Sequence, residues 1–440
     1  MNRNKARALW PAAILFFALP LLHAQDLTGN WQGTLNTDKE KLRVILQVEK
    51  SEGASLKGTL YSIDQTPNGM PVTAMSFSDG TIKFSVDAFH ISYEGKLASD
   101  GNIIAGTFTQ GKPTPLTFER ATKATAWQID SSPHKVQLTP VEGDIKLEVL
   151  DWGGAGRPLV LLTGLGDTAH VYDKFAPKLT ASYHVYGITR RGFGASSAPS
   201  PATASYSADR LGDDVLAVIA ALKISRPILA GHSIAGEELS SIGTRHPEKI
   251  AALIYLDAGY PHALYDKVHG ALFIDAIEVR EQINQLFAGK PPADDKQLID
   301  DLLVNLQLLQ KGLQQQQQDM QTVPPPPPPH PSTPPPPVRA IREGAQRYDT
   351  INGVPILAIF AVPHDLGGFM KDKPQLRAAM ETIDQRSVEN QARAFETQIP
   401  GAKVVRIPHA NHYVFRSNEA DVLREMNAFI ATLPPLTTEN

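Results

Sequence analysis

From about residue 135 onward, apolar runs alternate with helical patterns, and this alternation constrains the fold more than any other feature of the sequence. The runs are RPLVLLTG (157–164), YHVYGITR (183–190), RPILAGHS (226–233), IAALIYLDAG (250–259), VPILAIFAVP (354–363) and AKVVRIP (402–408). Short apolar runs of this kind are typical of strands buried on both faces, and amphipathic helical patterns such as 207–224 separate them. The sequence predicts an α/β domain over 135–440, with a mostly parallel sheet and helices on both faces.

Residues 25–122 follow a different pattern. Short alternating runs are separated by turn signals such as Ser78-Asp79-Gly80 and Ser99-Asp100-Gly101, which is typical of antiparallel β structure. We expect a small all-β barrel or sandwich here, acting as an accessory domain, with 123–134 as a linker. Two domains are expected because a single core rarely grows beyond about 300 residues and the chain has 440.

The first 24 residues predict a signal peptide. Arg3, Lys5 and Arg7 precede an apolar run that ends in the small-residue site Leu22-His23-Ala24. The run is shorter than the ~20 residues that a membrane span needs. We expect export to the periplasm or the extracellular space, with no stable membrane span after cleavage.

Between 262 and 350 the strand–helix alternation stops, and we expect a helical lid insertion over the sheet. Two amphipathic helices are predicted at 271–287 and 295–313. A Gln/Pro-rich stretch follows at 314–337, with glutamines at 314–318 and prolines at 324–329 and 334–337. Proline disfavours helix interiors and central strands, so we interpret this stretch as a surface linker, with polyproline II structure in the prolines.

Charge and composition exclude several classes of partner. The formal net charge is −4, and no basic run follows the first 24 residues, so a nucleic-acid partner is not expected. The absence of cysteine excludes disulfides, thiolate metal sites and lipid attachment through cysteine. The turn TGLGDTAH (163–170) lacks the third glycine of a dinucleotide fingerprint, so we expect no cofactor. The remaining expectation is a small-molecule substrate, and the oligomeric state is left open.

Ser233 lies in the setting of a nucleophile elbow. The strand-like RPILA precedes it, Gly231 and Ala235 flank it at two residues on either side, and a helical pattern follows from Glu237. This turn holds a serine in a strained conformation at the start of a helix. Alanine stands at 235 where glycine is usual, which is a small steric change. We expect His232 to pack at the elbow rather than act as a base.

The order of these features resembles the α/β-hydrolase family over residues 135–435. A Gly164-Leu165-Gly166 turn comes first, then the Ser233 elbow, then Asn411-His412 after the last strand. The resemblance implies Ser233 as nucleophile, His412 as its base, and the backbone amides of Leu165 and Ile234 as an oxyanion hole. An aspartate in place of Ser233 would have indicated a haloalkane dehalogenase or an epoxide hydrolase.

The resemblance also implies an acid that orients His412, and two residues compete for this role. Asp365 follows the penultimate strand, where the family usually places its acid, although the turn before it is one residue longer than usual. Asp257 ends the preceding strand and is the alternative. We favour Asp365. The spacing of His409 and His412, together with His364, invites a metal site, but the expected strand–loop–helix context explains His412, so we predict no metal.

The leading hypothesis is an exported serine hydrolase that cleaves carboxylic esters through a Ser-His-Asp triad and an acyl-enzyme. Two alternatives stay open. One is a proline-iminopeptidase-like amide hydrolase, in which acidic residues of the cap (Asp294, Asp295, Asp300 and Asp301) hold a substrate amine. The other is an inactive hydrolase scaffold that acts as a binding protein.

Overall fold

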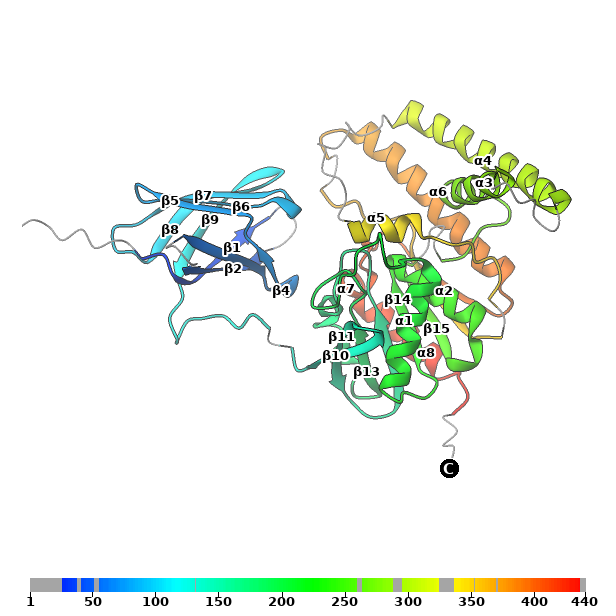
Figure 1. The fold of residues 1–440 in the computed structure, drawn as a ribbon, viewed down its shortest axis with the longest axis horizontal. Coiled ribbons are helices and arrows are strands. Elements are labelled where there is room, and N and C mark those ends of the chain that lie inside the picture. The colour runs from blue at the N-terminus through cyan, green and yellow to red at the C-terminus, as the bar shows by residue number, and fades with distance from the viewer. Residues whose placement is uncertain are drawn as a thin grey trace, which may run out of the picture.

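The alternating part of the chain forms one eight-stranded sheet in the computed structural model (Figure 1). The structure describes residues 26–37, 41–50, 55–130, 132–258, 263–287, 295–323, 336–351, 353–368 and 371–435; the side chains of 66–68 and 295 are not described. Three predicted features lie outside the described residues: the signal peptide 1–24, Asp294, and the prolines at 324–329, 334 and 335.

The large sheet is mixed but mostly parallel, and its strand order is β10-β11-β13-β12-β14-β15-β16-β17. β10 and β11 are antiparallel to their neighbours, whereas the pairs from β13–β12 to β16–β17 are parallel. This confirms the predicted fold class. The strands are Lys135–Glu142, Ile145–Gly153, Arg157–Leu162 (β12), Tyr183–Ile188, Ile228–His232 (β14), Ala252–Leu256, Ile356–Ala361 and Lys403–Ile407.

Helices cover both faces of this sheet. One face packs against α1, α2 and the C-terminal half of α6, through side chains such as Val215, Leu239 and Phe395. The other face packs against η2, η3, α7 and α8, through Tyr172, Phe415 and Met426. The bounds are α1 Ala208–Ala221, α2 Gly236–Arg245, α6 Pro374–Gln398, α7 Val414–Ser417, α8 Glu419–Ile430, η2 Ala169–Tyr172, η3 Ala176–Lys178, η4 Ser233–Ala235 and η5 Pro247–Lys249.

The N-terminal part is a single antiparallel sheet of nine strands in the order β4-β3-β2-β1-β9-β8-β7-β6-β5. Its two outer strands are consecutive in the chain, and the connection between them donates hydrogen bonds to both sides: Val72 to Gly58 of β3 and Thr73 to Ser85 of β6. The sheet therefore curls around its own core, where Trp31 is fully buried. The strands are Gly29–Asn36, Lys41–Lys50, Leu56–Ser62, Thr66–Pro71, Ala74–Ser78, Thr81–Val86, Ile91–Leu97, Ile103–Gln110 and Lys112–Arg120, with η1 at Asp87–Phe89.

The described residues between β15 and β16 form three α-helices, and with the N-terminal half of α6 these helices form a cap beside the large sheet (Figure 1). They are α3 Leu272–Phe287, α4 Asp295–Thr322 and α5 Pro336–Glu343. α6 joins cap and sheet, because Arg386 pairs with Asp319 of α4 at 2.5 Å while Val388 and Phe395 are buried. Among the described residues, no helix is both long and apolar enough to cross a membrane.

Two details of the predicted insertion are wrong. The glutamines 314–318 belong to α4, which continues to Thr322, rather than to a linker. Glutamine has good intrinsic helix propensity, so a helix that is already formed can extend through it. Pro336 and Pro337 begin α5, because proline is tolerated in the first turn of a helix, where its missing N–H would have had no partner.

Candidate active site

Ser233 stands between β14 and α2 in a left-handed backbone conformation, with φ = 55°. This conformation is uncommon for a residue other than glycine and is characteristic of a strained elbow. The elbow demands small neighbours, because a Cβ built on Gly231 would lie 3.0 Å from the Cβ of Ala235. The turn can therefore accommodate the methyl group of Ala235 because residue 231 is glycine and has no Cβ.

His412 reaches the elbow from the loop that follows β17. Its Nε2 lies 3.0 Å from Oγ of Ser233, which is the distance a general base needs to accept the hydroxyl proton. The His412 side chain is 36% exposed and Ser233 is half-buried. The structure brings the predicted nucleophile and base together at a position that solvent reaches.

Asp257 is hydrogen-bonded to the other ring nitrogen of His412. Nδ1 of His412 lies 2.6 Å from Oδ2 of Asp257, and the Asp257 side chain is 1% exposed. Burial alone would raise the pKa of this carboxyl, but the hydrogen bonds with His364 and His412 lower it below its usual value. Asp257 is therefore ionised at neutral pH, which is the state that stabilises an imidazolium.

The preference for Asp365 as the acid is wrong in this structure. The Asp365 side chain is 53% exposed, and its carboxylate accepts a hydrogen bond from the amide of Gly367 at 2.8 Å. The sheet order gives the physical reason. β15, which Asp257 follows directly, is the neighbour of β14 with Ser233, whereas β16 lies one strand farther away.

A second imidazole, that of His364, shares the carboxylate of Asp257, and this contact was not predicted. Nε2 of His364 lies 2.6 Å from the same Oδ2, while Nδ1 of His364 lies 2.9 Å from Asp384 on α6. The other oxygen of Asp257 accepts the amide of Ala361 at 2.9 Å. Burial lowers the pKa of His364, but its two carboxylate partners outweigh burial and raise it to about 10. His364 is thus a cation that keeps Asp257 ionised and in place.

The pKa of His364 predicts a pH-dependent stability. Its folded pKa of about 10 exceeds the unfolded value, so its contribution is full below about pH 6.5 and is lost as pH rises through about 10. We expect His364→Gln to lower the free energy of unfolding by about 3 kcal/mol at pH 6.5 and by much less at pH 10. Denaturant unfolding across this range measures the difference. His184→Gln, which removes a partly exposed pair with Asp151, should cost less than about 1 kcal/mol; a pH-independent cost of His364→Gln would contradict the assignment.

His232, the residue before Ser233, is not placed to act as a base. Its Nε2–H donates to the backbone carbonyl of His412 at 3.0 Å, which helps to fix the catalytic loop. Burial, together with the nearby His412, lowers the pKa of His232 to about 3, so this imidazole is neutral. A Cβ built on Gly164 would lie 2.9 Å from Nδ1 of His232, which explains the first glycine of the Gly-Leu-Gly turn.

The two predicted oxyanion-hole residues follow neighbouring strands of the sheet. β12 and β14 are parallel neighbours, and Leu165 and Ile234 follow their carboxyl ends. The Leu165 side chain packs in the same apolar cluster as that of Ile234. Both residues thus lie at the edge of the sheet that carries Ser233, and the role of their amides as donors to an oxyanion stays a prediction.

A buried ion pair between Arg190 and Glu238 contacts the Gly-Leu-Gly turn. The Arg190 guanidinium donates to the carbonyl oxygens of Thr163 at 2.8 Å and Gly164 at 3.2 Å, and it makes a two-pronged contact with Glu238 at 2.5 and 2.8 Å. Arg190 lies in the loop that follows β13. The pair ties this loop and α2 to the turn that carries Leu165.

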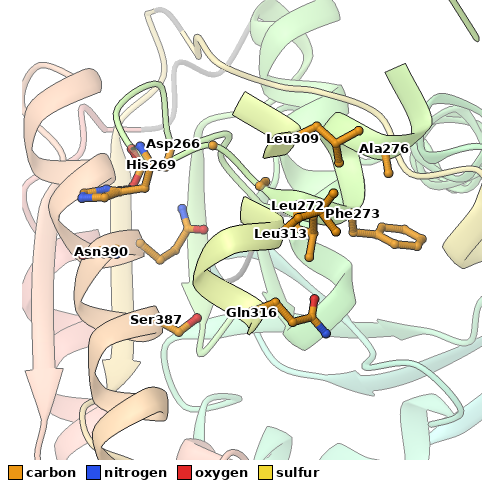
Figure 2. A pocket seen from close by; sticks show the side chains of 13 residues that line it. Asp266, His269, Leu272, Phe273, Ala276, Leu309, Leu313, Gln316, Ser387 and Asn390 are labelled. Carbon is orange, nitrogen blue, oxygen red and sulfur yellow. Dashed lines mark hydrogen bonds and ion pairs between the residues drawn. The ribbon is translucent and has the colours of Figure 1, made fainter. Parts of the chain in front are cut away.

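The cap contributes an apolar roof and a separate cavity. Ile341 of α5 packs in one cluster with Tyr206, Leu165 and Ile234. A cavity of about 590 Å³ lies between α3, α4 and α6, with Leu272, Leu309 and Leu313 on one side and Asp266, His269 and Asn390 on another (Figure 2). None of Ser233, His412 and Asp257 lines this cavity, so it is distinct from the site of the serine.

Asp257, His364 and His412 also meet the distances of a metal site, since one ligand atom of each lies within 4.8 Å of the others. The ring nitrogens that face Asp257 both lie 2.6 Å from the same oxygen, and Nε2 of His412 faces Ser233. These contacts assign the three side chains to a hydrogen-bond chain that ends on the serine. His409, the other histidine of the loop, is not part of this group.

The comparisons with known proteins agree with this architecture. The model of the alpha/beta hydrolase fold family matches residues 157–418. A fluoroacetate dehalogenase from Burkholderia sp is 30% identical over 128 residues, which are 29% of this chain and 42% of that protein. A 2-hydroxymuconate semialdehyde hydrolase from Pseudomonas sp. (strain CF600) is 32% identical over 106 residues, 23% of this chain and 37% of that protein. The chain thus spans about two fifths of the length of these curated relatives.

Among solved structures, the bromoperoxidase from Bacillus anthracis is similar over 68% of this chain and all of that chain. The TM-score is 0.43 and the sequence identity is 18%.

Proposed function

The chain belongs to the alpha/beta hydrolase family, and from this premise we propose that it is a serine hydrolase that cleaves carboxylic esters through an acyl-enzyme. One observation carries the proposal: a continuous chain of hydrogen bonds runs from Ser233 through His412 to the buried Asp257. A half-buried serine in a strained turn, hydrogen-bonded to an imidazole that an ionised acid orients, is the arrangement that makes a hydroxyl nucleophilic.

The proposed reaction follows from the positions of these groups. Oγ of Ser233 attacks the ester carbonyl while Nε2 of His412 takes its proton, and Asp257 stabilises the imidazolium. The amides of Leu165 and Ile234 donate to the oxyanion of the tetrahedral intermediate. The imidazolium then protonates the departing alcohol, and a water activated by the same imidazole releases the acid.

The surroundings of Ser233 support an apolar acyl or aryl group. Leu165, Ile234, Phe193 and Ile341 form one apolar cluster beside the elbow, and such surfaces bind apolar groups by removing them from water. One relative is named a dehalogenase. By the family resemblance, that reaction goes with an aspartate at the elbow, so Ser233 argues against it for this chain.

The amide-hydrolase alternative predicts carboxylates close to the serine that would hold a substrate amine. Asp300 and Asp301 are exposed on α4, and Asp301 accepts a hydrogen bond from Gln297 of the same helix at 2.8 Å. A solvated helix face explains both carboxylates, so we retain ester hydrolysis as the proposed reaction.

A substrate panel tests this choice. We expect kcat/KM for p-nitrophenyl esters of medium-chain acids to exceed that for the matched anilides and for aminoacyl naphthylamides by at least ~100-fold, because p-nitrophenolate leaves more readily than an aryl amine and the exposed Asp300 and Asp301 of α4 are explained by a solvated helix face. Initial rates on the three series, with the Ser233→Ala variant as a blank, give the ratio. Faster turnover of the aminoacyl amides would support the iminopeptidase-like activity instead.

Export is a second part of the proposal. It is supported by the basic residues, apolar run and small-residue site in residues 1–24. N-terminal sequencing of the protein recovered from outside the cytoplasm should begin at Gln25; an unprocessed N-terminus beginning at residue 1 or 2 would contradict export by this route.

A further inference from the structure

A second group of histidines and carboxylates lies outside the catalytic chain, where the linker meets the large sheet. Asp130 and His134 come from the linker before β10, and His170 and Asp173 come from η2 and the residue after it. One ligand atom of each side chain lies within 4.8 Å of the corresponding atoms of the others. We propose that these four side chains form a structural zinc site that fastens the linker to the hydrolase domain.

The distances within the group are close to those of a coordinated cation. Nε2 of His134 lies 3.0 Å from Oδ2 of Asp130, and Nδ1 of His170 lies 3.1 Å from Oδ2 of Asp173 and 3.8 Å from Oδ2 of Asp130. Ligands of a tetrahedral Zn²⁺ with bonds of about 2.0–2.2 Å are separated by about 3.3 Å. The two ring nitrogens of His134 each lie 3.0 Å from a different carboxylate, Asp130 and Asp173, so His134 would offer one nitrogen to the ion and the carboxylate on its other side would turn toward it.

Two buried atoms in the group depend on each other alone. Nδ1 of His134 and Oδ1 of Asp173 form an ion pair at 3.0 Å with poor hydrogen-bond geometry, and among the described residues neither atom has another hydrogen-bond partner. The His134 side chain is only 2% exposed. Buried polar atoms are nearly always well satisfied, so a cation that takes one of these two atoms as a ligand would stabilise this buried pair.

A third carboxylate is placed as the outer partner of a metal-bound imidazole. Nε2 of His170, the ring nitrogen that faces away from Asp130 and Asp173, lies 3.7 Å from Oε1 of Glu148. The other oxygen of Glu148 accepts the hydroxyl of Thr189 at 2.6 Å. Metal-bound histidines usually donate their second N–H to such a carboxylate, which fixes the orientation of the ring.

The ligand set favours zinc over calcium or magnesium. Two imidazoles and two carboxylates are nitrogen and oxygen donors that Zn²⁺ accepts in four-coordinate sites, whereas Ca²⁺ and Mg²⁺ prefer oxygen alone. Two carboxylates also neutralise a divalent ion. The prediction of no metal concerned the histidines around His412; Asp130–His134 and His170–Asp173 lie apart in the chain, and only the fold brings them together.

The position of the group gives the ion a structural task. On one side, the linker is tied to the N-terminal sheet, because Gln32 donates to the carbonyl of Thr125 at 2.9 Å and accepts from the amide of Trp127 at 3.1 Å. On the other side, η2 begins at Ala169, four residues after Leu165 of the oxyanion turn. An ion at this point would fix the linker against the segment that supports the turn.

The test uses the full chain, stripped of metal with a chelator and then titrated with Zn²⁺ alone. We expect one Zn²⁺ per chain by elemental analysis after dialysis, and a rise in the thermal unfolding temperature on adding Zn²⁺. His134→Gln and Asp130→Asn should each weaken binding at least ~10-fold in calorimetric titration. Asp130→Asn is the variant least prone to misfold, since its side chain is 31% exposed.

His184→Gln is the matched control, because it removes a histidine that pairs with an aspartate, Asp151, outside the group. It should bind Zn²⁺ like the unaltered chain. Failure to retain stoichiometric Zn²⁺, or equal affinity in Asp130→Asn, His134→Gln and the control, would overturn the proposal. The readout does not depend on catalysis, so the Ser233→Ala variant should bind Zn²⁺ unchanged.

Discussion

Replacing Ser233 with alanine is expected to lower kcat for ester hydrolysis by at least ~10⁴-fold, because the variant keeps the oxyanion turn but lacks the nucleophile. The variant should fold, since the change removes one oxygen atom at a half-buried position. Steady-state kinetics on a p-nitrophenyl ester measures the loss, and the thermal unfolding temperature confirms the folded state.

A control in α2, the helix that follows the elbow, separates loss of the chemistry from damage to the structure around Ser233. Ser240 and Ser241 lie on α2, and both are buried; the Ser241 hydroxyl donates to Asp209 at 2.7 Å. Ser241→Ala should lower stability by about 1 kcal/mol and leave kcat within a few-fold of the original. Residual activity of Ser233→Ala within 100-fold of the unaltered protein would show that another group performs the attack.

Replacing Asp257 with asparagine is expected to lower kcat by about 10⁴-fold, because the amide no longer selects the tautomer of His412 or stabilises its cation. The same change also leaves the His364 cation facing a neutral group. We therefore expect a loss of stability of about 3 kcal/mol as well. Kinetics should be measured well below the unfolding temperature of the variant.

Asp365→Asn is the paired control, since it alters the acid that the sequence favoured. Its side chain is 53% exposed and contacts Gly367 and Arg377 rather than His412. The variant should retain kcat within about two-fold, because the lost contacts are exposed and of little energetic value. A large loss in Asp365→Asn with little loss in Asp257→Asn would reverse the assignment of the acid.

The nucleophile and its base were predictable because they depend on chain order. A buried strand, a small-x-Ser-x-small turn and a helix are local features that single out Ser233 as a candidate, and its position between the Gly-Leu-Gly turn and the late His412 supports the assignment. His412 follows the last strand of the domain, and the carboxyl ends of parallel strands meet at one edge of the sheet. Order along the chain therefore placed both groups at that edge.

The acid was not predictable in the same way. Asp257 and Asp365 both follow strands of the parallel sheet, and the choice depends on which strand adjoins β14 and on the path of each loop. Asp257 follows its strand directly, whereas Asp365 stands four residues beyond β16, in a loop that instead brings His364 to the site. The extra residue in the loop before Asp365 indicated a departure from the usual pattern. It did not indicate that Asp257 would be the acid.

Features that depend on contacts between distant segments were also missed. The pair of Asp384 with His364 joins α6 to the loop after β16, and Arg190 joins the loop after β13 to Glu238 of α2. The helical glutamines were missed for another reason. Composition suggested a linker, but the local helix propensity of 314–318 prevailed once residues 295–313 had formed α4.

Mass spectrometry of the acyl-enzyme tests the central claim most directly. The protein is mixed with a p-nitrophenyl ester or a fluorophosphonate, quenched in acid and digested. We predict one adduct per chain, located on Ser233, and a burst of p-nitrophenol equal to the concentration of protein. No adduct on the peptide that contains Ser233, or an adduct of equal yield in the Ser233→Ala variant, would contradict the account.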